Sequence, residues 1–298
     1  MIERSKLTLM TFPMDEDIQK KRLTYDDVFR LAVECGLSYL DVMHVSKKAI
    51  PQYVSLMEKY KISVYCYIDV VSLFLPDWMI RASVKAGIKT AKSLRAEKFM
   101  IVPYIPVMDT GKATRWGREK TLQKLAHGFA IAVREGRQQD IPICFETTPR
   151  SEIHLSGTKD CLEVLTNVSG LEYVHDTANM LPAGEQPLTA FETMLPYTSH
   201  IHLKDVTLTD TANPGPFAEV TGDGKQMTRC RWGDGVIPIQ RIVQTAKAQG
   251  YQGKYAIEYA SPELSNRSFA DHKQQLQLFL QHLDCAAEPV NGFLREQQ

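Results

Sequence analysis

The sequence lacks the features that mark several large classes of protein. No stretch of its 298 residues approaches the about 20 apolar residues of a transmembrane helix. Residues 1–6 carry charge and are not followed by an apolar core of signal-peptide length. We therefore expect a cytoplasmic protein without a membrane partner.

An excess of one charge is also missing. Lys plus Arg and Asp plus Glu each number 35, which leaves no formal net charge, and no long run of one sign occurs. Proteins that hold nucleic acid by general electrostatics carry clustered basic residues. The balance therefore argues against a nucleic-acid partner.

Paired cysteines and nucleotide-binding glycines are absent as well. The six cysteines are scattered, with no Cys-x-x-Cys pair. This distribution predicts reduced thiols and argues against a disulfide framework or a thiolate zinc site. No Gly-x-Gly-x-x-Gly follows the first expected strand, which argues against a dinucleotide-binding doubly wound sheet.

What the sequence does contain is a regular alternation of short β-type runs with amphipathic stretches. Expected strands cover residues 7–12, 39–42, 62–68, 98–102, 141–145, 171–175, 200–203 and 255–257. Expected helices cover 24–34, 49–60, 76–94, 121–138, 158–168, 188–195, 237–249 and 269–283. This alternation predicts a single (β/α)8 TIM barrel, with residues 1–298 as one domain.

Two connections between these elements are longer than most. Residues 104–116 follow the fourth expected strand, and residues 206–232 follow the seventh and concentrate Pro and Gly. Loops after barrel strands lie on the face that carries active sites. We expect 104–116 to be a loop that can cover a site, and 206–232 to be an irregular lid or binding loop.

Four expected strands end in a carboxylate or an imidazole: Glu146, Asp176, His202 and Glu258. Each has an ordinary explanation on its own, as a rim carboxylate, a turn cap or a buried histidine. Together, three acidic groups at one barrel mouth would repel one another unless a cation neutralised them. Oxygen ligands with one imidazole suit Mn²⁺, Mg²⁺, Co²⁺ or Zn²⁺, so the residues predict a metal site.

The order of these motifs resembles the sugar phosphate isomerase/epimerase superfamily of xylose isomerase-like barrels. The resemblance is carried by Glu146, His-Asp-Thr-Ala-Asn at 175–179, His-x-Lys-Asp at 202–205, Trp-Gly-Asp-Gly at 232–235 and Gly-Tyr-x-Gly at 250–253 with Ile-Glu following. It spans nearly the whole chain and is strongest from Cys144 to Glu258.

This resemblance implies one divalent metal ion, Mn²⁺ in the first place, bound by Glu146, Asp176, His202 and Glu258. It also implies that Glu146 and Glu258 lie on opposite sides of the substrate and relay a proton through an enediolate. The expected activity is that of an isomerase or epimerase acting on a sugar, a sugar phosphate or a small hydroxy-carbonyl compound.

Further side chains are candidates for contacting the substrate. Lys204 shares a strand face with His202, although a lysine paired with Asp205 at the rim is an equal alternative. Asn179 stands where many sugar epimerases carry a histidine three residues after the strand-six aspartate. Arg150 begins the loop after the fifth expected strand and could bind an anionic group or remain solvated.

Two more candidates depart from the pattern of the resemblance. Some members carry an arginine a few residues after the strand-seven histidine, and this chain does not; Arg229 or Arg231 could supply that charge from the long loop. His175 precedes Asp176 and points away from it by strand alternation. A role in binding substrate or metal is therefore less favoured for His175 than no role in the site.

Other functions stay open at this point. A dehydratase needs the same metal and base and in addition expels a β-hydroxyl, and members of the resembled superfamily dehydrate inososes and dehydroshikimate. A barrel that binds a polyol without catalysis, and a homo-oligomer, are compatible with the sequence. An apurinic endonuclease is disfavoured, because related barrels with that chemistry use three metals and more strand-end histidines.

Overall fold

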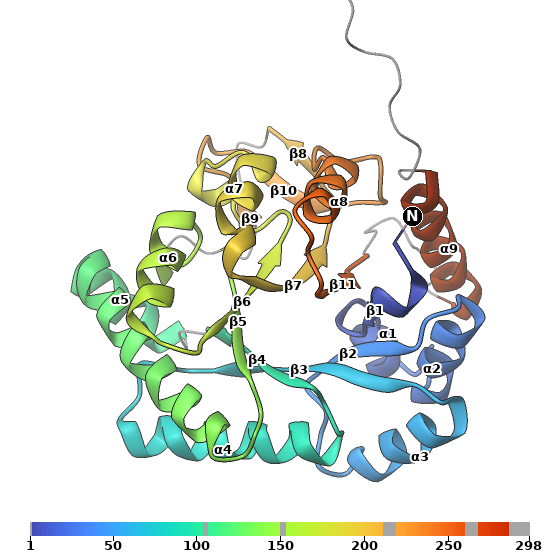
Figure 1. Ribbon diagram of the computed structural model, residues 1–298, viewed down its shortest axis with the longest axis horizontal. Helices are drawn as coiled ribbons and strands as arrows, with labels where there is room; N and C mark the ends of the chain where they lie inside the picture. Colours follow the sequence, from blue (N-terminus) through green and yellow to red (C-terminus); the bar gives the residue numbers. More distant parts are fainter. Residues whose placement is uncertain (1, 104–106, 150–152, 211–218, 260–267, 286–298) are drawn as a thin grey trace, which may run out of the picture.

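The computed structural model describes residues 2–103, 107–149, 153–210, 219–259 and 268–285. Its parallel strands close into a barrel in the order β1-β11-β7-β6-β5-β4-β3-β2, with helices around the outside (Figure 1). The barrel strands are β1 (Leu7–Met10), β2 (Tyr39–Met43), β3 (Ser63–Val71), β4 (Lys98–Pro103), β5 (Ile143–Glu146), β6 (Glu172–Asp176), β7 (Thr198–Leu203) and β11 (Lys254–Ile257). The predicted (β/α)8 barrel is confirmed.

The helices follow the strands in the expected alternation. They are α1 (Asp15–Gln19), α2 (Tyr25–Glu34), α3 (Ile50–Tyr60), α4 (Asp77–Ser93), α5 (Val107–Arg137), α6 (Thr158–Asn167), α7 (Pro187–Met194), α8 (Ile239–Ala248) and α9 (Phe269–Cys285). Short 3₁₀ turns occupy η1 (Arg4–Lys6), η2 (Phe12–Met14), η4 (Leu181–Ala183) and η5 (Leu195–Tyr197). None of the described helices combines the length and the apolar character needed to span a bilayer.

Local sequence signals explain where elements begin. At α2, Thr24 Oγ1 accepts from the backbone N–H of Asp27 at 3.1 Å, and Asp27 Oδ2 accepts from the N–H of Thr24 at 2.9 Å. This reciprocal pair satisfies two backbone donors that the first turn of a helix leaves free. The helix therefore begins where the sequence predicted it.

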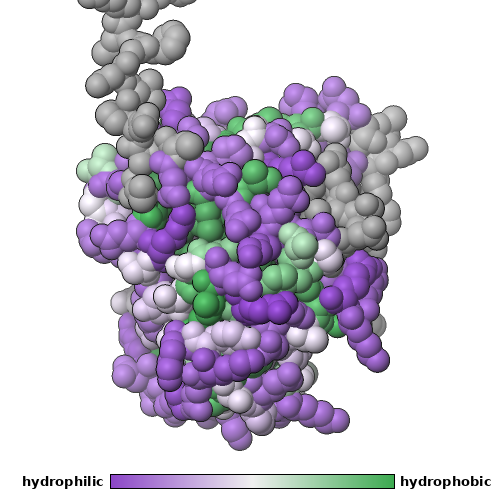
Figure 2. All heavy atoms as spheres, turned by 90° about the vertical axis from the view of Figure 1, so that its right-hand side faces the viewer, coloured by the Kyte–Doolittle hydropathy of each residue, from purple (hydrophilic) through white to green (hydrophobic). Residues whose placement is uncertain are grey.

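Two buried layers hold the barrel together. Apolar side chains between the strands and the helices form the larger core, and Met10, Cys66, Met100, Cys144 and Val174 belong to a smaller cluster of inward-facing strand residues. The described cysteines are free thiols, as expected for a chain without paired cysteine motifs. On the side of the molecule shown in Figure 2, apolar side chains are scattered among hydrophilic ones.

The prediction of a loop over residues 104–116 was wrong for most of that range. Residues 107–116 belong to α5, which is interrupted by non-helical backbone at Gly117, with φ 70° and ψ 170°. Gly111 does not prevent this, because a single glycine within a helix is tolerated, and residues 104–106 lie outside the described residues.

The expected irregular loop at 206–232 also contains regular structure. It folds into a three-stranded antiparallel sheet of β8 (Val206–Thr209), β10 (Gln226–Arg229) and β9 (Glu219–Val220), in that order. The turn between β9 and β10 closes through Thr221 Oγ1, which accepts from Lys225 N at 2.9 Å, and Gly224 provides the positive φ of 87°. We call β8, β9 and β10 the antiparallel sheet below.

Candidate metal centre and substrate cavity

The structure brings the four expected ligand residues together at the carboxyl end of the barrel. Glu146 ends β5, Asp176 ends β6, His202 lies near the end of β7, and Glu258 directly follows β11. These four strands are neighbours in the barrel, and Asp176 pairs in register with His202. One side-chain atom from each residue lies within 4.8 Å of the other three.

The imidazole of His202 is turned so that its two nitrogens face different groups. Nδ1 lies 3.1 Å from Glu146 Oε1 and 3.8 Å from Glu258 Oε2. Nε2 has no hydrogen-bond partner among the described residues and lies 3.7 Å from Asp41 Oδ2. The Nδ1 atom is therefore the one that can join the carboxylates as a ligand.

The two oxygens of Asp176 have separate environments. Oδ1 accepts from the backbone N–H groups of Ala178 at 2.8 Å and Asn179 at 3.0 Å. Oδ2 has no well-aligned hydrogen bond among the described residues but lies 2.9 Å from Lys204 Nζ as an ion pair. Asp176 therefore caps the turn with Oδ1, and Oδ2 remains available to a cation.

Lys204 points into the site. Its Nζ donates to Asn179 Oδ1 at 2.5 Å, and Asn179 Nδ2 donates to Thr147 O at 2.9 Å, so the lysine and the amide hold each other beside the carboxylates. Asp205 does not pair with this lysine in the structure. Its carboxylate instead accepts backbone N–H groups of Val206, Gly233, Gly235 and Ile237 at 2.9 to 3.2 Å.

Burial and neighbouring charges together shift the pKa values of the cluster. Burial raises the pKa of Glu146 to about 7, even though His202 opposes the change. Burial alone would lower the pKa of His202, but neighbouring carboxylates, Glu146 foremost, raise it to about 9. Burial likewise opposes ionisation of Asp176, but Lys204 lowers its pKa. The raised pKa values mean that Glu146 and His202 hold protons more strongly than free side chains do, and a divalent cation at this position would compete with those protons.

These observations test whether the residues fit a metal ion. The donors are three carboxylates and one imidazole, which form a set that divalent ions such as Mn²⁺ and Zn²⁺ accept. All four side chains are buried, and buried carboxylates need a compensating cation. The residues fit one divalent ion.

A cavity of about 140 Å³ opens beside the cluster. Its lining comprises Met10, Phe12, Met43, Ile68, Met100, Val102, Glu146, Thr147, Thr148, Pro149, Asn179, Lys204, Glu219, Arg229 and Glu258. Apolar strand-end side chains therefore form one wall, and charged or polar groups form the other. Glu219 and Arg229 come from the antiparallel sheet, so the described part of the segment 206–232 contributes side chains to the cavity.

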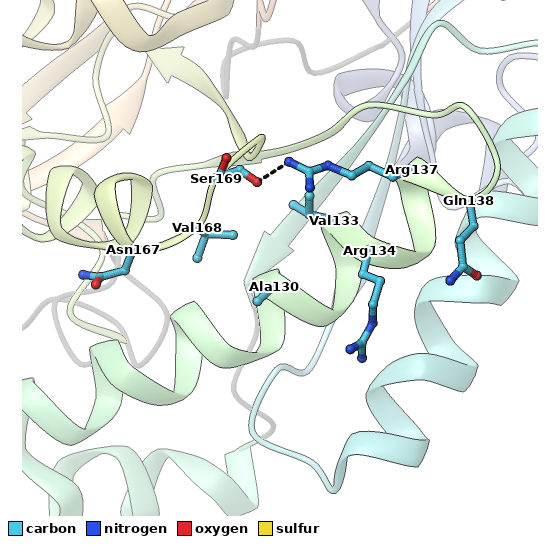
Figure 3. A pocket seen from close by; sticks show the side chains of 8 residues that line it. All are labelled: Ala130, Val133, Arg134, Arg137, Gln138, Asn167, Val168 and Ser169. Atoms are coloured by element: carbon cyan, nitrogen blue, oxygen red, sulfur yellow. Dashed lines mark hydrogen bonds between the residues drawn. The ribbon is translucent and has the colours of Figure 1, made fainter.

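Larger hollows exist on the outer surface but lack this chemistry. One of about 470 Å³ lies between α5 and the end of α6 and is lined by Ala130, Val133, Arg134, Arg137, Gln138, Asn167, Val168 and Ser169 (Figure 3). Arg137 is held there by donating to Ser169 O at 2.7 Å (Figure 3). No carboxylate or imidazole is among the described residues that line this hollow, so it is not the candidate active site.

Other substrate-contact candidates lie elsewhere. Arg231 is exposed and lines a separate hollow of about 170 Å³ with Trp232. His175 is fully buried, with Nδ1 3.3 Å from Tyr173 OH and its ring centroid 5.1 Å from that of Phe191, and it is not among the cavity residues. Arg150 lies outside the described residues.

Two buried polar residues next to the cluster, Asp41 and His200, were not predicted as site residues from the sequence. Asp41 of β2 and His200 of β7 join through Asp41 Oδ2 and His200 Nε2 at 2.6 Å. His200 precedes His202 by two residues, and Asp41 lies between Tyr39 and Met43, which belong with the inward-facing cluster. Because alternate side chains of a strand face the same way, these spacings could have indicated that Asp41 and His200 face the barrel interior.

The fold and the site define a TIM barrel with a candidate metal centre at its strand ends. The chain matches the family model of the xylose isomerase-like TIM barrel over residues 29–282 and belongs to that family. The predicted resemblance to the sugar phosphate isomerase/epimerase superfamily is confirmed. The relatives described below include proteins named as a dehydratase and as an epimerase, and the prediction that this chain is an enzyme of the family is confirmed.

Among curated proteins, the chain is similar to inosose dehydratase 1 of Bacillus cereus. The two are 26% identical over 153 residues, which cover 50% of each chain. An inosose dehydratase of Lacticaseibacillus casei is 25% identical over 138 residues, 46% of each chain. The chain thus spans about half the length of the curated relatives that it matches.

Solved structures of similar fold cover nearly the whole chain. D-psicose 3-epimerase from Clostridium cellulolyticum H10, solved with D-tagatose, aligns with a TM-score of 0.68 at 15% identity, covering 95% of this chain and 100% of that one. The IolI protein, solved with a zinc atom, aligns with a TM-score of 0.69 at 13% identity and the same coverage. At these identities the likeness establishes the fold alone.

Proposed function

We propose that this protein is a divalent-metal-dependent isomerase or epimerase that acts on a sugar, a sugar phosphate or a small hydroxy-carbonyl compound. The observation that carries the proposal is the convergence of four donor side chains, each within 4.8 Å of the others, beside a cavity of about 140 Å³. A cavity of this size suits a substrate smaller than the drug-sized ligands that fill about 300–1,000 Å³.

In this proposal Glu146, Asp176, His202 and Glu258 hold one ion, with Mn²⁺ as the first candidate and Mg²⁺, Co²⁺ or Zn²⁺ as alternatives. When bound, such an ion would polarise a substrate carbonyl and acidify the neighbouring C–H bond. Lys204 keeps Asp176 in place through their 2.9 Å ion pair. Asn179 links that lysine to the end of β5, because it also donates to Thr147 O at 2.9 Å.

Glu146 and Glu258 are the proposed acid/base pair. Both line the cavity, and they come from β5 and β11, which are separated in the barrel by β6 and β7. A substrate between them can lose a proton to one carboxylate and regain a proton from the other. The apolar wall with Met10 and Met43 keeps water away from the reacting carbon.

Arg229 and Lys204 supply the cationic groups that contact substrate oxygens. Arg229 Nη2 lies 3.3 Å from Glu258 Oε1, so an oxygen that binds the guanidinium is brought next to this carboxylate. Charge-assisted hydrogen bonds of this kind orient a small polar substrate more strongly than neutral ones do.

A dehydratase is the second candidate, because the chain is 26% identical over 153 residues to a protein named inosose dehydratase. The first step, removal of a proton next to a carbonyl, would be shared. The reaction would then continue with loss of a β-hydroxyl as water, with a protonated side chain such as Glu146 as the acid.

One experiment separates these functions. The Mn²⁺-loaded protein is incubated in deuterated water with a panel of ketoses and inososes, and products are followed by NMR and mass spectrometry. Deuterium next to the carbonyl without loss of water supports the isomerase or epimerase, and loss of water supports the dehydratase. Binding without exchange or elimination in the whole panel would contradict both and favour a polyol-binding barrel.

The same assay tests the acid/base pair. Glu258→Gln should slow deuterium exchange by the ~10²–10⁴-fold typical of losing a general base. Metal content is measured alongside, because Glu258 is also a proposed ligand. Glu172→Gln is the matched control, because Glu172 is the first residue of β6 and therefore lies at the amino end of the barrel strands, away from the cluster at their carboxyl end. Exchange at the wild-type rate by metal-loaded Glu258→Gln would refute the role of Glu258.

A further inference from the structure

A second group of buried polar side chains lies one step deeper in the barrel than the candidate metal centre. Asp41, His200 and His202 are each fully buried. His200 and His202 are two residues apart on β7, so both side chains point to the barrel interior. Their rings lie 5.0 Å apart at an interplanar angle of 86°.

Hydrogen bonding fixes the role of His200. Its Nδ1 lies 2.9 Å from Lys254 O, and a carbonyl oxygen can only accept, so this nitrogen carries a proton and donates. Its Nε2 lies 2.6 Å from Asp41 Oδ2, within hydrogen-bond distance. Both nitrogens of His200 are therefore engaged, and His200 acts as an anchor for Asp41.

His202 is left with one nitrogen that faces Asp41. Its Nε2 lies 3.7 Å from Asp41 Oδ2, and neither His202 Nε2 nor Asp41 Oδ1 has a hydrogen-bond partner among the described residues. Its Nδ1 faces Glu146 and Glu258. An Nε2–H directed at Asp41 leaves the Nδ1 lone pair directed at the carboxylates, which is the tautomer a metal ligand requires.

We propose that Asp41 is a positioning residue that orients His202 for metal binding, and that His200 holds Asp41 in place. This inference rests on the proposed metal centre. Imidazole ligands commonly donate their second N–H to a carboxylate, which fixes the ring and strengthens the ligand. Asp41 is suited to that task because it comes from β2, outside the four ligand strands, and so supports β7 from across the barrel interior.

A competing explanation is a second metal ion held by Asp41, His200 and His202, whose ligand atoms also lie within 4.8 Å of one another. That site would have to break the 2.6 Å hydrogen bond between His200 Nε2 and Asp41 Oδ2, and it would have to share His202 with the first ion. The hydrogen-bonded arrangement therefore favours the positioning role.

The test is a titration of the metal-free protein with Mn²⁺ by calorimetry and with Co²⁺ by visible absorption. The wild type should bind one ion per chain. Asp41→Asn keeps the shape of the side chain and removes its charge, and should weaken binding by the 10–100-fold typical of losing such a partner, with an altered Co²⁺ spectrum. His200→Gln should also weaken metal binding. If Asp41→Asn fails to fold, His200→Gln provides the test.

Glu172→Gln is the matched control, because it removes a different strand carboxylate, one that accepts from Lys98 Nζ at 2.9 Å. Its affinity and Co²⁺ spectrum should equal those of the wild type. Wild-type affinity and spectrum in Asp41→Asn and His200→Gln would overturn the inference while leaving the proposed function in place. If the wild type binds two ions and both variants bind only one, Asp41 and His200 belong to a second metal site and the positioning role is wrong. No binding by the wild type would remove the proposed function itself.

Discussion

The guanidinium of Arg229 meets the carboxylate of Glu258, with 3.3 Å between Nη2 and Oε1. Arg229 ends β10 of the antiparallel sheet, and Glu258 directly follows the last barrel strand. The Cζ atom of Arg229 also lies 5.0 Å from the ring centroid of Phe12, so the arginine is held between two parts of the barrel rim. The antiparallel sheet is therefore a wall of the cavity.

Replacing Arg229 with methionine should lower kcat/KM at least about tenfold, because one good charge-assisted contact to the substrate contributes about 1.5–3 kcal/mol. Metal affinity should be retained, since Arg229 is not a proposed ligand and its charge repels a cation. Arg231→Met is the matched control, because Arg231 is two residues away but exposed. Equal losses in the two variants would show that Arg229 has no special role in the cavity.

The turn after β10 should depend on a single carboxylate. Asp205 accepts the N–H groups of Val206, Gly233, Gly235 and Ile237, and Gly235 has no room for a side chain because an added Cβ would lie 1.9 Å from Asp205 Oδ1. Asp205→Ala leaves these donors unpaired and should reduce the free energy of unfolding by at least about 2 kcal/mol.

Urea unfolding measures this effect. Asp234→Ala removes an exposed carboxylate from the same turn and should change stability by no more than about 0.5 kcal/mol. If Asp205→Ala is as stable as Asp234→Ala, the turn is held by other contacts.

Metal binding should stabilise the fold. At an ion concentration of about 100 times Kd, binding to the folded protein alone increases the free energy of unfolding by about 2.7 kcal/mol. This increase raises the Tm by several degrees. His202→Asn should abolish the rise, because it removes the imidazole that lies 3.1 Å from Glu146. Glu172→Gln should keep it. Differential scanning calorimetry with Mn²⁺ and with a chelator checks this, and an unchanged rise in His202→Asn would speak against the assigned site.

Acid sensitivity should arise in part from His175. Burial lowers its pKa in the folded protein to about 4, below its ordinary value of 6.5. The unfolded chain therefore binds an extra proton between these values, so stability falls as the pH drops from about 6.5 to 4. Over this window the contribution of His175 is roughly 3 kcal/mol.

His175→Gln stays neutral and should lose this part of the pH dependence. The comparison is made by urea unfolding at several pH values in the presence of a chelator, so that metal release does not contribute. Parallel stability curves for the two proteins would show that His175 does not titrate as its burial indicates.

Much of the site could be predicted because it follows from strand ends. The apolar runs before Glu146, Asp176 and Glu258 place these residues at the carboxyl ends of strands, and parallel strands bring such ends together. The inward direction of Lys204 follows from strand alternation, because Lys204 is two residues after His202. In the structure its Nζ contacts Asn179 and does not pair with Asp205. These relations depend only on local sequence and on barrel geometry.

The rest depends on contacts between distant segments. Asp41 and His200 are 159 positions apart, and nothing local signals that they form a pair. The choice between Arg229 and Arg231 depends on where β10 ends and the chain turns away, because Arg229 is the last residue of β10 and lines the cavity, whereas Arg231 lies beyond the strand; the sequence pattern left this choice open. The antiparallel sheet was also missed, because its strands are short and are separated by glycine- and proline-rich segments.

The central claim is that Glu146, Asp176, His202 and Glu258 bind one divalent cation. The most direct measurement is an anomalous difference map from crystals of the Mn²⁺-loaded protein, recorded at a wavelength where manganese scatters anomalously. The account predicts one strong peak that contacts His202 Nδ1 and the three carboxylates at about 2.0–2.3 Å, the range typical of such ligands. A peak at another position, or no peak in crystals that contain Mn²⁺ at saturating concentration, would contradict it.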